Sequence, residues 1–170
     1  MQHAGMIAHA RAMASYNRWM NGRLYETCAQ LSDEQRKQDV GAFFKSIHGT
    51  LNHLLLADRI WMGRFTATTF ACASLRDELY ADFEQLRRER EQGDARISAW
   101  VDGLQTGDLQ AELYFMRVVN PQPRCYPLWF ALSHFFNHQT HHRGQVTALL
   151  SQFQLDPGVT DLLALPEFQQ

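Results

Sequence analysis

LYADFEQLRREREQGDARISAWVDGL, residues 79–104, is the stretch that indicates the fold most clearly. Its core-type positions are separated by alternating steps of four and three residues, which is typical of helices packed in left-handed bundles. The apolar residues at these positions are Leu79, Phe83, Leu86, Ile97, Trp100 and Leu104, and Arg90 and Gly93 occupy the two positions between Leu86 and Ile97. At about 1.5 Å per residue the stretch predicts a helix of roughly 40 Å, in which Gly93 is a candidate weak point. Residues 87–91 alternate in charge and predict a solvated helix face rather than a nucleic-acid contact.

Three other segments have a helical apolar periodicity, which brings the expected number of long helices to four. They cover residues 6–31, 44–65 and 127–153. A capping box from Ser32 to Gln35 predicts a short additional helix after the first one. The absence of proline from the first 120 residues agrees with long helices.

Residues 106–127 have a different character, because apolar and polar residues alternate there around a turn at residues 120–123. This pattern favours an extended excursion with a small hairpin. We therefore predict an all-α fold with a single domain over residues 1–170. It is a four-helix bundle with a long excursion before the last helix.

The composition excludes several classes of protein. The 170 residues include 16 Lys and Arg against 18 Asp and Glu, so the formal net charge of −2 argues against a nucleic-acid-binding protein. The sequence has no apolar run long enough to span a membrane, and residues 1–6 do not resemble a signal peptide. Cys28, Cys72 and Cys125 form no CxxC pair and predict reduced thiols, so we expect a cytoplasmic protein.

The histidines are the unusual feature of the sequence, because His134, His138, His141 and His142 fall within nine residues. At roughly 100° per residue, the first, second and fourth form one ridge along the helix, and His142 lies nearest its apolar arc. Two histidines one turn apart can bind one metal ion, although a hydrophilic helix face would show the same cluster. The spacing leaves three pairs open: His138 with His142, His134 with His138, or His138 with His141.

A third ligand would come from another helix, and His53 is the candidate. In a helical projection it lies in the apolar arc of residues 44–65, whereas His48 faces the polar side with Asn52 and Arg59. Taken alone, such a histidine is more often a core residue that is hydrogen-bonded to a neighbour. Together with a histidine pair on another helix, it favours a three-histidine metal site.

These residues resemble those of a known family. Residues 136–145, FNHQTHHRGQ, closely resemble the NHxTHHRGQ signature of the DinB family. Residues 16–21, YNRWMN, resemble the family's YNxWAN opening, with Met20 in place of the usual alanine. Residues 46–53, SIHGTLNH, resemble its SIxxTLxH element, and DRIW follows at residues 58–61. The resemblance covers roughly residues 12–66 and 128–165, whereas residues 67–127 match only in general helical character.

The resemblance implies a four-helix bundle, commonly a homodimer, with a divalent metal ion held by His53, His138 and His142. It thereby selects one of the three histidine pairs and leaves His134 and His141 beside the site or in solvent. Zinc or nickel suits three imidazole ligands best, and iron or manganese is also compatible. No other cofactor site is assigned.

The resemblance reaches members described as metal-dependent hydrolases and relatives that resemble S-transferases of low-molecular-weight thiols. Three ligands would leave positions for water or a thiol, and the alternative is a non-catalytic metal-binding bundle that acts as a stress-related sensor or interaction protein. The substrate is an unidentified small molecule, and no catalytic residue is assigned. Asp58 is expected to pair with Arg59 or Arg143, and Tyr114 and Tyr126 are candidates for the mouth of the site.

Overall fold

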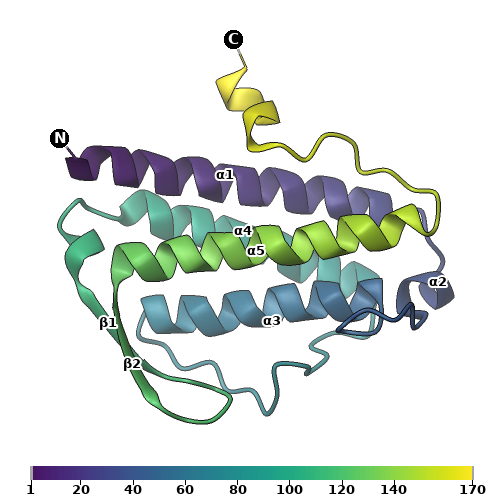
Figure 1. Cartoon of the computed structure of the whole chain (residues 1–170), viewed down its shortest axis with the longest axis horizontal. Helices are drawn as coiled ribbons and strands as arrows, with labels where there is room; N and C mark the ends of the chain where they lie inside the picture. The colour runs from purple at the N-terminus through teal and green to yellow at the C-terminus, as the bar shows by residue number, and fades with distance from the viewer. Residues whose placement is uncertain (1, 170) are drawn as a thin grey trace.

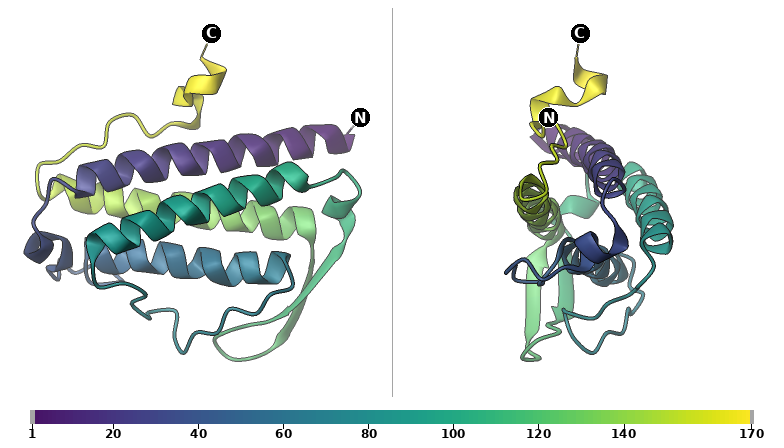
Figure 2. Two further views of the ribbon diagram at one scale, coloured as in Figure 1. Left: turned by 180° about the vertical axis from the view of Figure 1, so that it is seen from behind. Right: turned by 90° about the vertical axis from the view of Figure 1, so that its right-hand side faces the viewer.

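The computed structural model describes residues 2–169, with side chains from residue 5 onward, and its four long helices lie side by side (Figure 1). They are α1 (Gln2–Cys28), α3 (Ile47–Phe65), α4 (Phe83–Gly103) and α5 (Leu128–Ser151). Helix α1 packs against α4 and α5, and α3 packs against the same two helices, so α1 and α3 face each other across the bundle. The end-on view in Figure 2 shows this arrangement, and the predicted helical bundle is confirmed.

Several shorter elements accompany the four long helices. Helix α2 (Asp33–Lys37) begins at Ser32 with the predicted capping box. Strands β1 (Glu112–Met116) and β2 (Pro123–Pro127) form the predicted antiparallel hairpin, in which Leu113 pairs with Tyr126. Three single-turn 3-10 helices complete the fold: η1 (Asp108–Gln110), η2 (Leu162–Ala164) and η3 (Pro166–Phe168). Among residues 2–169, no helix combines the length and the apolar character that a membrane span requires.

The segment after α5 returns along the outer side of α1 (Figure 1). Arg23 donates hydrogen bonds to the carbonyl oxygens of Pro157 and Val159, each at 2.6 Å, and the hydroxyl of Tyr16 donates to that of Thr160. The side chain of Leu165 is buried against α1. These contacts attach the C-terminal segment to the bundle.

Helix α4 begins at Phe83, four residues later than the apolar spacing predicts. Asp82 caps the helix by accepting a hydrogen bond from the backbone N–H of Gln85. The backbone N–H groups of Leu79 and Tyr80 instead donate to Oδ1 of Asn52 on α3, at 2.8 and 3.0 Å. Asn52 therefore holds residues 79 and 80 in a non-helical connection, and the polar side of α3 that it shares with His48 is buried.

Two apolar clusters fill the bundle, one toward α2 and one toward the hairpin, and a layer of buried polar side chains lies between them. Arg90 is at its centre, with only 2% of its surface exposed. Its guanidinium pairs with Asp58 at 2.5 Å and with Asp94 at 2.9 Å. The expected pairing of Asp58 with Arg59 or Arg143 was therefore wrong, and so was the position of Arg90 on a solvated face.

The remaining members of this polar layer surround the two carboxylates. Asn17 and Asn21 of α1 donate hydrogen bonds to Asp94, and Gln139 of α5 donates to Asp58. Arg143 donates to Asn17. Gly93, the candidate weak point of α4, makes room for this network, because a Cβ there would lie 3.0 Å from a guanidinium nitrogen of Arg90.

Candidate metal centre

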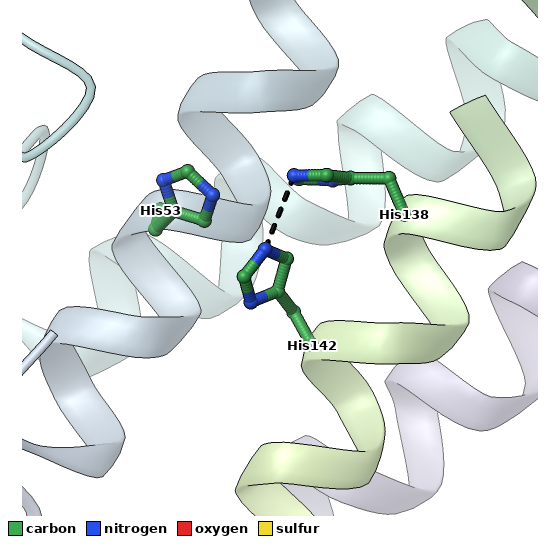
Figure 3. Close-up of side chains that lie close together, drawn as sticks. All are labelled: His53, His138 and His142. Atoms are coloured by element: carbon green, nitrogen blue, oxygen red, sulfur yellow. Dashed lines mark hydrogen bonds between the residues drawn. The ribbon is translucent and has the colours of Figure 1, made fainter. Parts of the chain in front are cut away.

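Three histidines converge between α3 and α5 (Figure 3). His53 comes from α3, and His138 and His142 come from successive turns of α5. One ring nitrogen from each lies within 4.8 Å of the others. The Nε2 atoms of His138 and His142 are 3.1 Å apart. The structure thus brings together the three residues that the family resemblance implies.

The other two histidines of the cluster lie outside this group. His134 is exposed, and its ring packs on Trp61 with 5.1 Å between ring centroids. His141 is also exposed, with its ring 4.8 Å from that of His142. Of the three pairs that the spacing leaves open, only His138 with His142 joins His53.

Hydrogen bonds orient two of the three rings. Nδ1 of His53 lies 2.9 Å from the carbonyl oxygen of Leu75, and Nδ1 of His142 lies 2.7 Å from Oε1 of Gln145. Because a carbonyl oxygen only accepts hydrogen bonds, each ring bears its proton on Nδ1 and keeps a lone pair on Nε2. This is the usual arrangement around histidines that bind metal ions. The three side chains therefore fit a divalent cation.

Burial keeps the three rings neutral at neutral pH, as metal binding requires. Loss of solvation lowers the pKa of His53 to about 4, and the ring stacks on Phe44 with 3.9 Å between centroids. Burial, together with the neighbouring His142 and His53, lowers the pKa of His138 to about 3. The pKa of His142 is also lowered, mainly by burial.

Two residues that orient the ligands were not assigned from the sequence. Gln145 belongs to the HHRGQ block and lies three residues after His142, a spacing that places it on the same side of the helix. Its position could therefore have been predicted. Leu75 contributes only its backbone carbonyl from a connecting segment, and no side-chain pattern indicates that contact.

The two tyrosines expected at the mouth of the site have different positions. Tyr126 lines a cavity that reaches His53 and His138, in agreement with the prediction. Tyr114 is 70% exposed and donates a hydrogen bond to Glu112, so its predicted place was wrong. The two residues are in different strands, and Tyr114 pairs with Cys125 rather than with Tyr126.

Comparison with known proteins gives consistent results. The model of the family described as "DinB family" matches residues 6–170. The curated "Protein DinB" of Bacillus subtilis (strain 168) is 27% identical over 161 residues, which cover 92% of each chain. The crystal structure of a DinB-like protein from Bacillus cereus ATCC 10987 superposes with a TM-score of 0.62 at 18% identity, over 82% of this chain and 90% of that one. The matched residues include all three converging histidines, and the chain belongs to the DinB family.

Proposed function

We propose that this protein is a divalent-metal-dependent enzyme, a hydrolase or a thiol S-transferase, in which His53, His138 and His142 bind the ion. The observation that supports the proposal is the convergence of three neutral imidazoles within 4.8 Å. In the part of the chain that the structure describes, no fourth His, Cys, Asp or Glu joins them. Structural zinc sites usually have four protein ligands, so three favour a site that keeps positions open for reactants.

The chain's own residues would hold and orient the ion. Gln145 and the carbonyl of Leu75 fix the rings of His142 and His53, and both His53 and His138 border a cavity through which a small molecule can enter. When bound, such an ion supplies Lewis-acid chemistry and lowers the pKa of a water or thiol at an open position. Zinc and nickel are the preferred candidates for this ligand set, followed by iron and manganese.

The second candidate function is a metal-binding bundle without catalysis, acting as a stress-related sensor or interaction protein. One observation favours it: among the described residues that line the cavity, none is an Asp or a Glu that could act as a general base. The two candidates differ in one measurable property, because only the enzyme would turn over a substrate.

Elemental analysis of the protein, purified without a histidine tag at neutral pH, tests the metal site directly. We expect about one divalent ion per chain. Hydrolysis and thiol-transfer screens would then compare the metal-loaded protein with the metal-free protein. Failure to bind zinc or nickel after incubation would reject the enzyme proposal, and binding without any turnover would favour the second candidate.

Replacement of Gln145 tests whether it positions His142. We expect Gln145→Leu to weaken metal binding about 10–100-fold, because the Nδ1 proton of His142 loses its acceptor. Gln145→Glu keeps an acceptor oxygen and should restore most of the affinity, which a purely structural role would not explain. Gln152→Leu, an exposed change just after α5, is the matched control. Equal metal affinity in all these variants would contradict the assignment.

Three further expectations stay predictions: a homodimer, a cytoplasmic location and a low-molecular-weight thiol as a reaction partner. Light scattering on the purified protein measures its mass in solution and tests the first of them.

A further inference from the structure

A cavity of about 560 Å³ lies beside the three histidines. Its walls come from α3, α5, the hairpin and the connection between α3 and α4, and His53 and His138 form part of one wall. This volume lies within the range that is typical of sites for small molecules. Four aromatic side chains also line it: Trp61, Phe115, Tyr126 and Phe130.

The charges around this cavity all have the same sign. Arg64, Arg117 and Arg124 line it, and its described lining residues include no acid. Within the described residues, none of these arginines has a carboxylate oxygen within 4.0 Å. The whole chain has a net charge of −2, so the positive charge is a local property of this cavity.

Arg64 packs against two of the aromatic rings. Its guanidinium carbon is 4.1 Å from the centroid of the Phe115 ring and 4.5 Å from that of Trp61. Burial lowers the pKa of this guanidinium, although it stays charged at neutral pH. A planar cation that contacts two rings and has no carboxylate partner is well suited to bind a carboxylate or phosphate through paired hydrogen bonds.

Arg124 is positioned differently, by the two residues that precede it in the sequence. Its guanidinium donates to the carbonyl oxygen of Pro123 and to Oε1 of Gln122, each at 2.9 Å. These neutral acceptors orient the side chain without cancelling its charge. Arg117 is exposed at the end of the hairpin, where its charge would attract an anion toward the cavity.

We propose that this cavity binds the substrate of the proposed enzyme, and that the substrate is a small molecule with an anionic group on a flat apolar body. Arg64 binds the anionic group, Arg117 and Arg124 assist it, and the aromatic rings contact the apolar part. The assignment of the cavity as a substrate site depends on the proposed function. Its preference for an anion depends only on the arginines and can be measured without a metal ion.

Calorimetry with simple probes tests this preference. We expect metal-free protein to bind 2-naphthoate about tenfold more tightly than the neutral 2-naphthamide, which has the same ring system. Acetate, which has the charge without the rings, should bind more weakly than either. Arg64→Gln should remove most of the tenfold difference while affinity for 2-naphthamide changes little.

Arg88→Gln is the matched control, because Arg88 is an exposed arginine on α4 that does not line the cavity. Circular dichroism of each variant would verify that it folds. Equal affinity for naphthoate and naphthamide would overturn the inference. So would an unchanged preference in Arg64→Gln, or binding of naphthoate only after metal is added, since the ion would then be its partner.

The same measurements separate this inference from the proposed function. Protein that binds naphthoate selectively but takes up no metal would support the anion site and reject the metal-dependent enzyme. Protein that binds metal but does not distinguish naphthoate from naphthamide would overturn the anion site alone.

Discussion

Arg90→Met is expected to lower the free energy of unfolding by about 3–5 kcal/mol at neutral pH. Arg90 is buried in the middle of the bundle and contacts the carboxylates of Asp58 and Asp94, which are also buried. Methionine keeps a long apolar side chain but removes the charge. Two carboxylates would then remain in the protein interior without the cation that stabilises their ionised forms.

The loss should depend on pH with a definite sign. Burial raises the pKa of Asp58 to about 6 even beside Arg90, and burial also raises the pKa of Asp94. Without the guanidinium, both values would rise further. When the pKa of an acid is higher in the folded than in the unfolded state, the protein loses stability as pH increases. The loss begins at the pKa of the unfolded state, near 4, and is complete above the pKa of the folded state. Arg90→Met should therefore be most destabilised above about pH 6 and recover part of its stability at about pH 5.

Urea unfolding followed by circular dichroism would measure the effect at about pH 5 and about pH 8. Arg88→Met makes the same substitution at an exposed position of α4 and should change the free energy of unfolding by less than about 0.5 kcal/mol. Adding Asp58→Asn and Asp94→Asn to Arg90→Met should restore part of the loss. If Arg90→Met and Arg88→Met unfold alike, the buried ion pairs do not stabilise the fold.

This polar layer explains what half of the family signature does. Asn17 and Asn21 of the YNRWMN stretch bind Asp94, and Arg143 of the HHRGQ block binds Asn17. These contacts are in the bundle interior. The other half, which includes His53, His138, His142 and Gln145, forms the candidate metal centre. A sequence pattern marks both sets equally, and only the contacts distinguish them.

The long helices and the hairpin could be predicted because their periodicity and turn residues are local properties of the chain. Arg90 was assigned to the surface from another local property, the run of charged residues around it. The four-three spacing, however, puts it on the apolar side of the helix. The spacing was the better guide there. The start of α4 at Phe83 is marked locally by its cap Asp82, which the apolar spacing does not include. The hydrogen bonds from Leu79 and Tyr80 to Asn52 on α3 are long-range, and no local pattern contains them.

The cavity was also beyond prediction from sequence. Its three arginines come from α3, from the residue directly after β1 and from β2. They meet only because the hairpin lies beside α3 and α5. The motifs that carried the resemblance lie outside residues 67–127, so they gave no indication of the cavity, although the family model matches residues 6–170. That part of the chain is where members of one fold could differ most in the small molecules they accept.

The second large effect concerns the metal ligands. We expect His53→Ala, His138→Ala and His142→Ala each to reduce bound metal from about one ion per chain to almost none under the same purification. Two imidazoles alone bind a divalent ion much more weakly than three, and the structure offers no replacement ligand among the described neighbours. His134→Ala and His141→Ala remove exposed rings of the same helix and should retain the metal.

Thermal unfolding gives a second readout that does not depend on purification. Because a metal ion that binds only the folded state stabilises it, zinc at a hundred times its dissociation constant should stabilise the wild type and His134→Ala by about 2.7 kcal/mol. The three ligand variants should unfold at the same temperature with zinc or with a chelator. Scans in chelator alone would reveal any loss of packing, such as the stacking of Phe44 on His53. If a ligand variant is stabilised by zinc as strongly as His134→Ala, that histidine is not a ligand, and the three-histidine assignment is wrong.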